Sequence, residues 1–310
     1  MSRSNGPQFK TWFSRLVLLS TLCASPLVSA DSSCPMLASY YNRHMAIIAG
    51  TAWGWTDSAS PTPIQTSAVQ VGVGKDVYYT LLANGELTAL VDGTKETMTL
   101  MKGVSRFAAG DSGVFAIDSA RTLWHIRHAE QPRRIAENVS AAAIGDGTDY
   151  YVTTSGELFA HGKGHRGQFG DGHDRLTPTS QFLPVASDVN DVKAHTGHAL
   201  YLSHSGEVMG TGGNIYGPLS RHGLGDKATH WGRIFTDATA IATGASHSAA
   251  IRKDGSLWVW GKGYAIEPEH FRDQVTCVAA GSSATIALLG DDSLWQWNSG
   301  EEPHRILLIQ

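Results

Sequence analysis

The sequence has little cysteine, little charge and few long apolar runs. Of its 310 residues, 3 are cysteine and 17% are charged. Beyond residue 30, no apolar run is long enough to span a bilayer, so we expect no membrane-spanning helix there. The sequence also contains no Gly-x-Ser-x-Gly elbow, no phosphate-binding glycine loop and no His-Glu-x-x-His motif. Enzyme function therefore has no support in the sequence, and we predict no catalytic residue and no cofactor.

Residues 1–30 differ from the rest of the chain. They carry Arg3, Lys10 and Arg15 without any acid, followed by the apolar run LVLLSTLCASPLV. A positive start, an apolar run too short to span a bilayer stably and a Val-Ser-Ala ending are typical of a secretory signal peptide. We predict cleavage before Asp31, which would leave a secreted or periplasmic protein that is not inserted in the membrane. An uncleaved N-terminal anchor is the alternative.

The chain that would remain after cleavage is acidic. It has 21 Lys and Arg against 28 Asp and Glu, a formal net charge of −7. Because such a surface does not favour polyanions, we expect no nucleic-acid partner.

A short pattern recurs along this chain. Clear copies are VSRFAAG (104–110), VSAAAIG (139–145), ATAIATG (238–244) and VTCVAAG (275–281), each with an apolar residue in fourth place and a final glycine. Each copy is followed by a second apolar run, a turn and a third apolar run. Runs this short, with turn residues at roughly every 8 to 12 positions and no sustained 3.6-residue period, indicate β-strands and exclude a helical solenoid.

The turns between the second and third runs are predicted to contain two residues. Four of them contain glycine, which adopts positive φ without strain. They are Asn84-Gly85, Ser155-Gly156, Ser205-Gly206 and Asp254-Gly255. Ala120-Arg121 and Asp291-Asp292 lack glycine, so we expect looser connections at those two places.

The repeat units set the predicted fold. They begin near residues 68, 104, 139, 189, 238 and 275, and residues 44–65 resemble one further, degenerate unit. Seven units give about 40 residues each, the size of a four-stranded propeller blade. We therefore predict an all-β fold in which residues 31–310 form a single seven-bladed β-propeller. Its blades are expected near residues 34–67, 68–103, 104–138, 139–188, 189–237, 238–274 and 275–310.

Two segments resemble a known repeat. IATGASHSAAI (241–251) is similar to the signature of the regulator of chromosome condensation repeats, which runs small-small-Gly-x-x-His into an apolar strand. GHRGQFGDG (164–172) is similar to the Gly-Gln-Leu-Gly loop after the third strand of that repeat. The resemblance implies a seven-bladed propeller, in agreement with the number of units. The family includes a nuclear nucleotide-exchange factor, a plant UV-B photoreceptor and the secreted β-lactamase inhibitory protein of the second type, and the predicted export favours the setting of the last.

The pair Ser246-His247 has the residue types of an active site, but the histidine position recurs. Its equivalents in the units are Val77, Gly113, Thr148, His198, His247 and Ala284, with His44 in the first unit. A catalytic base is needed once, beside a nucleophile and an orienting group. We therefore predict a structural imidazole, half-buried and hydrogen-bonded to neighbouring backbone.

The 14 histidines form no metal-ligand pattern. His161 and His165 flank a strand end and a glycine turn, so no helical spacing places them on one face, and a two-plus-two ligand pattern is missing. We predict no metal site.

Tryptophan pairs occupy the third apolar run of three units. They are Trp53/Trp55, Trp258/Trp260 and Trp295/Trp297. Residues i and i+2 of a strand point to the same side, so we predict packing between blades. A stacking site for sugars is the alternative.

Two units are oversized. Those starting at 139 and 189 run 50 and 49 residues, against 35 to 37 in the other four full units. The extra residues follow the third run, at 164–183 and 213–231, and equivalent connections of neighbouring blades emerge on one face. We predict that they adjoin and bind a protein partner, with tolerated insertion as the alternative. The predicted partner-binding residues, all taken as exposed, are Arg166, Phe169, His173, Arg175, Tyr216, Arg221, His222, Lys227 and Trp231.

Cys34 and Cys277 stand where the ring must close. Cys277 takes the third place of its unit's opening run, which other units fill with a mixed set of residues, so we expect an accessible position. Cys34 lies at the start of the first blade, at the end of the chain that must dock beside the last blade. An exported chain with an even number of cysteines also favours pairing. We predict a Cys34–Cys277 disulfide, on the order of 5 kcal/mol in the chain-entropy model, with two free thiols as the alternative.

Together these features predict an exported, non-catalytic propeller that binds a protein and inhibits or scaffolds it. By the resemblance to the inhibitory protein, the mechanism would be occlusion of a partner's active site by a rigid loop face. A glycan-binding or glycan-acting propeller and a structural surface protein are the alternatives.

Overall fold

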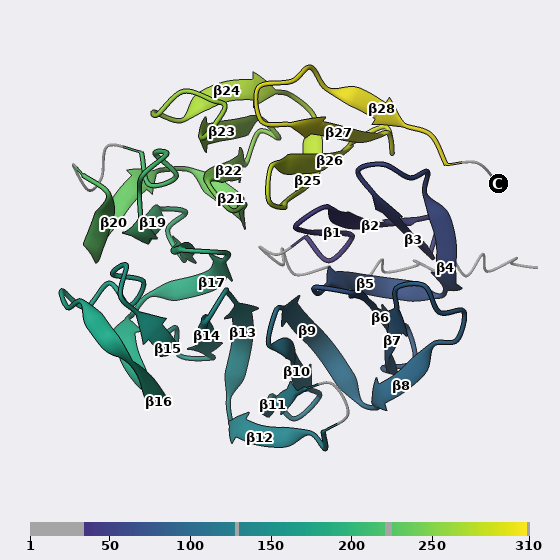
Figure 1. Cartoon of the computed structure of the whole chain (residues 1–310), viewed down its shortest axis with the longest axis horizontal. Coiled ribbons are helices and arrows are strands. Elements are labelled where there is room, and N and C mark those ends of the chain that lie inside the picture. The colour runs from purple at the N-terminus through teal and green to yellow at the C-terminus, as the bar shows by residue number, and fades with distance from the viewer. Residues whose placement is uncertain (1–33, 128–129, 221–224, 309–310) are drawn as a thin grey trace, which may run out of the picture. The chain divides into compact units, whose positions relative to one another are not determined.

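The computed structural model describes residues 34–127, 130–220 and 225–308. In them, 28 strands form seven antiparallel four-stranded sheets arranged around a centre (Figure 1). The predicted all-β, seven-bladed propeller is confirmed. None of the described residues forms a helix long and apolar enough to cross a membrane. The predicted signal peptide, residues 1–30, lies outside the described part of the chain.

The first four blades follow one another along the chain. The first contains β1 (Leu37–Tyr40), β2 (Arg43–Ile48), β3 (Thr51–Thr56) and β4 (Thr62–Thr66). The second contains β5 (Ala68–Val73), β6 (Val77–Leu82), β7 (Leu87–Val91) and β8 (Met98–Met101). The third contains β9 (Val104–Gly110), β10 (Gly113–Asp118), β11 (Leu123–Ile126) and β12 (Arg133–Ala136). The fourth contains β13 (Val139–Ile144), β14 (Thr148–Thr153), β15 (Leu158–Gly164) and β16 (Arg175–Ala186).

The last three blades continue the series. The fifth contains β17 (Val189–Ala194), β18 (His198–Ser203), β19 (Val208–Gly213) and β20 (Lys227–Phe235). The sixth contains β21 (Ala238–Thr243), β22 (His247–Arg252), β23 (Leu257–Gly261) and β24 (Glu269–Arg272). The seventh contains β25 (Val275–Ala280), β26 (Ala284–Leu289), β27 (Leu294–Asn298) and β28 (His304–Ile306). In Figure 1 the first strand of each blade lies nearest the centre and the fourth lies at the rim.

The apolar core is divided among the blade interfaces. Each of seven buried clusters contains side chains from two neighbouring sheets, including the pair formed by the seventh and first blades. Each sheet is covered by a neighbouring blade on both of its faces, so side chains on both sides of its second strand are buried. In β26, for example, all six residues are buried. At the rim, β28 is exposed or half-buried. This explains why the second runs of the repeat read as continuous apolar stretches rather than as alternating ones.

The turns between second and third strands differ from the prediction. The Leu82 N–H donates to Glu86 O at 2.9 Å and the Gly85 N–H to Leu82 O at 2.9 Å, so the connection has three residues, with Gly85 at φ +81°. The expectation of looser connections without glycine was wrong. Arg121 and Asp292 adopt φ +62° and +60° and close the same hydrogen-bonded turn.

The tryptophan pairs pack between blades, as predicted. The second member of each pair is almost fully buried and donates its indole N–H to the preceding blade. The donor and acceptor atoms are Trp55 Nε1 and Gln296 Oε1 at 2.7 Å, Trp260 Nε1 and Pro218 O at 2.7 Å, and Trp297 Nε1 and the Tyr264 hydroxyl at 2.8 Å. These bonds tie the third strands of the first, sixth and seventh blades to the blade before each of them.

The ring closes between the seventh and first blades without sharing a strand. The predicted disulfide between Cys34 and Cys277 is present, with 5.3 Å between the two Cα atoms. Gln296 accepts from Trp55 and donates to the Asp57 carboxylate at 3.1 Å, which adds a polar link at the same interface. Cys277 is only 3% exposed, so the expectation of an accessible position was wrong. It lies within the apolar cluster that joins the two blades.

Candidate functional site

The two oversized units place their extra residues on one face of the propeller. In an antiparallel four-stranded blade, the connection between the third and fourth strands leaves the same face as the one between the first and second. In the fourth and fifth blades the third-to-fourth connections are residues 165–174 and 214–226. Part of the predicted loops is strand instead, because β16 and β20 begin at Arg175 and Lys227 and are extended to 12 and 9 residues.

The two connections share one backbone frame. Gly167 and Gly217 adopt φ +80° and +78°, and in each connection the residue three places later donates its N–H to that glycine's carbonyl at 2.9 Å. Within this turn the first connection has Phe169 and the second has Leu219, and both side chains are 0% exposed. Residues 167–170 and 217–220 thus each form a tight turn with one buried apolar side chain on its inner side.

Side chains of the following blade hold both frames in place. Thr211 donates to Gly167 O at 2.8 Å. In the second connection, Trp260 and Ser248 donate to the next carbonyl along, Pro218 O, at 2.7 and 2.9 Å. The buried carbonyls are therefore satisfied, and the two connections have fixed positions relative to the blades.

The first connection contacts the start of β20, so the predicted segments 164–183 and 213–231 adjoin. An isolated β-bridge joins Asp171 of the first to His230 of β20, and the Lys227 ammonium forms an ion pair with the Asp174 carboxylate. The fourth and fifth blades therefore present one continuous surface.

Three of the predicted contact residues are exposed there, and one of them, His173, has its Nδ1 3.5 Å from the Asp171 carboxylate. Arg166, His173 and Tyr216 have exposed side chains. Lys227 is exposed too, but its ammonium is engaged by Asp174.

The remaining predicted residues lie differently. Phe169 is buried, so its assignment as an exposed contact was wrong, because it is the inner apolar side chain of its loop. Arg175 is half-buried, paired with Asp171 and placed 5.2 Å over the Phe169 ring. Trp231 is half-buried against Tyr201, with ring centroids 4.8 Å apart. Arg221 and His222 lie outside the described residues.

A groove of about 210 Å³ lies between the two connections and the first-to-second turns beside them. Arg166, Tyr216 and Lys227 line it, together with Gly197 and Asp226. Three predicted contact residues thus meet at one concave feature.

Sequence reasoning missed the apolar and cationic neighbours of Tyr216. Ile215 is 67% exposed, Tyr216 52% and Ile266, from the sixth blade, 57%. The Lys262 ammonium lies 5.0 Å from the centre of the Tyr216 ring. Exposed apolar side chains gathered in this way are typical of binding surfaces.

The histidines of the repeated position are structural, but fully buried rather than half-buried. His247 Nε2 lies 2.9 Å from Thr285 Oγ1, and His198 Nε2 lies 3.0 Å from Ser248 Oγ, so the partners are side chains of the next blade rather than backbone. Burial lowers the pKa of His198 to about 3 and that of His247 to about 4. Neutral imidazoles tied between blades serve as interblade links. Among the described residues, no group of three or more His, Cys, Asp or Glu is placed to hold a metal ion.

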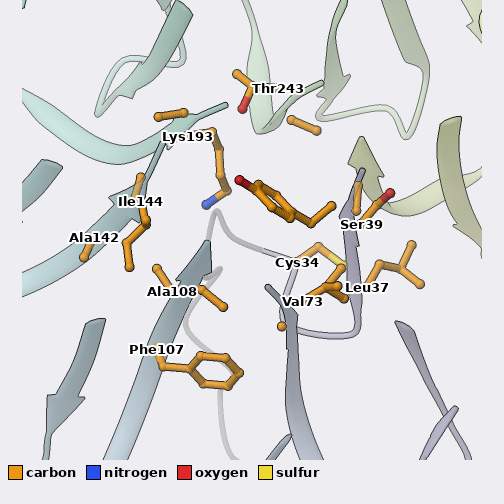
Figure 2. A pocket seen from close by; sticks show the side chains of 18 of the residues that line it. Cys34, Leu37, Ser39, Val73, Phe107, Ala108, Ala142, Ile144, Lys193 and Thr243 are labelled. Carbon is orange, nitrogen blue, oxygen red and sulfur yellow. The ribbon is translucent and has the colours of Figure 1, made fainter. Parts of the chain in front are cut away.

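A second cavity of about 180 Å³ lies at the centre of the ring, lined by the first strands of the blades. Figure 2 shows the Lys193 amine among apolar side chains such as Ile144 and Ala108. That amine is paired with the buried Asp191 carboxylate at 2.7 Å. His195 accepts the Thr196 N–H at Nδ1, and burial lowers its pKa to about 3. In this cavity the Lys193 amine is thus paired and the His195 imidazole is neutral, while Arg106 donates to the backbone carbonyl of Ser140.

Comparison with known proteins places the fold. The Regulator of chromosome condensation (RCC1) repeat matches residues 238–265. The E3 ubiquitin-protein ligase HERC2 of Homo sapiens is 29% identical over 140 residues, which cover 42% of this chain and 3% of that protein. The Regulator of chromosome condensation of Drosophila melanogaster is 33% identical over 114 residues, covering 35% of this chain and 21% of that protein.

Solved structures extend the likeness over most of the chain. Prp20p from Saccharomyces cerevisiae superposes with a TM-score of 0.70 at 15% identity, covering 83% of each chain. At that identity the likeness concerns the fold. The chain spans well under two thirds of the length of the curated relatives it matches first.

Proposed function

Because the chain carries a regulator of chromosome condensation repeat within a seven-bladed β-propeller, we propose that it is an exported, non-catalytic module that binds a protein through the face of the fourth to sixth blades. One observation carries the proposal. Ile215, Tyr216 and Ile266 are all more than half exposed; the first two line a groove, and Ser248 holds the carbonyl of Pro218 in the connection that carries them. A rigid surface loses little conformational freedom on binding, so its contacts contribute more fully to affinity.

Export is proposed from two features that agree. Residues 1–30 have the composition of a secretory signal peptide. The Cys34–Cys277 disulfide belongs to an oxidising compartment. Mass spectrometry of the protein recovered from the periplasm or medium should give a chain that begins at Asp31 and gains mass on alkylation only after reduction. A chain that retains residues 1–30 would contradict export with cleavage.

If the protein is an inhibitor, it would act by covering the active site of its partner with this face. The groove lies between two connections that cannot collapse, because Thr211, Ser248 and Trp260 hold their carbonyls. A partner seated on this face would have the covered part of its surface closed to other molecules.

Capture from the extracytoplasmic fraction of the native source tests the binding face. We expect proteins that bind the wild type to be lost with the double variant Ile215→Ser, Tyr216→Ser. Met98→Ser is the matched control, because Met98 is 51% exposed on β8, in the second blade. Capture of the same proteins by the double variant and the wild type would reject this face.

A further inference from the structure

Arg166 at the groove has a side chain to which no residue that the structure describes forms a hydrogen bond or ion pair. It is exposed, and among the described residues no hydrogen bond or ion pair holds its guanidinium; only its backbone N–H is bonded, to Gln168 Oε1 at 2.8 Å. The side chain lies over Gly197 and Gly213. A Cβ added at Gly197 would come within 2.7 Å of Arg166 Nη1, and one at Gly213 within 3.5 Å of Cδ. The two glycines therefore provide the space in which this cation lies.

A second cation lies on the other side of the exposed apolar cluster. The Lys262 ammonium is 5.0 Å from the Tyr216 ring centre and has no carboxylate partner among the residues that the structure describes. Ile266 packs close to the same loop, since a Cβ added at Gly217 would lie 3.4 Å from its Cγ2. The exposed apolar side chains are thus bordered by two cations that lack counter-ions.

Two carboxylates lie near the two cations: Asp226 in the groove and Glu267, which follows Ile266 and accepts a hydrogen bond from Ser220 Oγ at 2.8 Å. Asp226 is exposed and lines the groove, whereas Asp174 is neutralised by Lys227. Asp226 would weaken the binding of a group with more than one negative charge, such as a phosphate.

Resting on the proposed protein-binding function, we propose that the partner presents an acidic segment. In it, an Asp or Glu carboxylate is bound by Arg166, and a neighbouring apolar side chain packs on Ile215, Tyr216 and Ile266. The planar guanidinium fork matches a carboxylate with two parallel hydrogen bonds. The apolar cluster supplies the area that a lone ion pair lacks. The net negative charge of the whole chain, −4, argues against a nucleic acid as the polyanion at this surface.

A displayed library of random short peptides, selected on the folded protein, tests the inference without a known partner. We expect enrichment of Asp or Glu next to an apolar residue, and weaker binding of the selected peptides at high salt. Arg166→Ala should lower their affinity by about tenfold or more, since hydrogen bonds between charged groups contribute about 1.5 to 3 kcal/mol. Arg166→Lys should lower it less, because the charge remains and the fork is lost.

Three further variants make the assignment specific. Gly197→Ala should weaken binding by displacing the Arg166 guanidinium, which is the end of a flexible side chain and can move without unfolding the protein. Asp226→Asn should strengthen it several-fold by removing like charge. Arg233→Ala is the control, because Arg233 is an exposed arginine already paired with Glu207 on the same blade.

The outcomes separate this inference from the proposed function. Peptides that need Ile215 and Tyr216 but show no acidic preference would overturn the inference and leave the protein-binding face in place. Acidic peptides that bind Arg166→Ala as well as wild type would also overturn it, as would a selection that enriches no peptide. The capture experiment decides the proposed function independently of all three.

Discussion

The two long connections of the fourth and fifth blades have the same inner side and different outer sides. Inside, Phe169 and Leu219 are buried at equivalent places beneath the same glycine turn. Outside, the first connection exposes charged side chains, with Asp171 paired to Arg175 of β16 and Arg166 at the groove, whereas the second exposes the apolar side chains Ile215 and Tyr216. The inner side therefore determines where each loop stands, and the outer side is free to carry a contact chemistry. Variants of the two sides should separate stability from binding.

The largest expected effect is the loss of the inner side chains. Phe169→Ala should lower the free energy of unfolding by about 3 to 5 kcal/mol and Leu219→Ala by about 2 to 5 kcal/mol, because each leaves a cavity in a packed site. Ile215→Ala is the outer-side control and should change stability by less than about 0.5 kcal/mol. Denaturant unfolding followed by tryptophan fluorescence measures all three. Similar losses for Leu219→Ala and Ile215→Ala would break the distinction between inner and outer sides.

Mild acid should weaken the second connection before the first. His198 bonds to Ser248, which holds Pro218 O, while the equivalent Thr148 of the fourth blade does not titrate in this range. The folded pKa of His198, about 3, lies below the unfolded value near 6.5, so the unfolded chain binds more protons between these values. The stability that neutral His198 provides is thus complete above about pH 6.5 and falls as the pH drops towards 3, by about 2 to 3 kcal/mol at pH 4.5.

Hydrogen exchange, corrected for the intrinsic effect of pH, measures this difference. Amides at 213–220 should lose protection at higher pH than those at 164–170, and His198→Gln should remove the difference. Equal loss in both connections would show that the histidine link does not support the second one. Asp149 changes the stability of the whole protein in the opposite direction. Burial raises its pKa to about 7, so the stability that protonated Asp149 provides is present in acid and is lost as the pH rises through 7.

The smallest expected effect concerns the ion pairs of the outer side. Lys227→Ala should cost less than about 1 kcal/mol, because both partners of the Lys227–Asp174 pair are more than 40% exposed. Arg175→Ala should cost more than Lys227→Ala, since Arg175 also covers Phe169 and is less exposed. Thermal unfolding at low and high salt compares them. A larger loss for Lys227→Ala would mean that the outer charges, and not the buried frame, hold the loops.

The repeat made the fold predictable from the sequence. Each blade must bury both faces of its sheet, so the same short apolar runs recur in every unit. The turns were less predictable. Arg121 and Asp292 hold positive φ in the same turn that glycine makes elsewhere, and the Asp118 carboxylate accepts the Ala120 and Thr122 N–H groups at 2.9 Å to support one of them. A side chain that caps a turn in this way compensates for the missing glycine.

The candidate site was only partly predictable, because its members come from different blades. The length of two units pointed to the correct connections, but polar neighbours concealed that Phe169 is buried. Its spacing from Gly167 equals that of Leu219 from Gly217, and that shared spacing is the clue within the sequence. Lys262 and Ile266 belong to the sixth blade and reach Tyr216 only through the packing of blades, which no local pattern reports.

The Cys34–Cys277 bond also determines what happens when the chain is cut. The two residues are 243 positions apart, so nearly every peptide bond of the propeller lies within the loop that the bond closes. Each sheet consists of consecutive strands, and a cut between two blades therefore interrupts no sheet. A protease that nicks one such connection would release no fragment: the two pieces would stay joined through sulfur and packed in the ring, and would separate on a denaturing gel only after reduction.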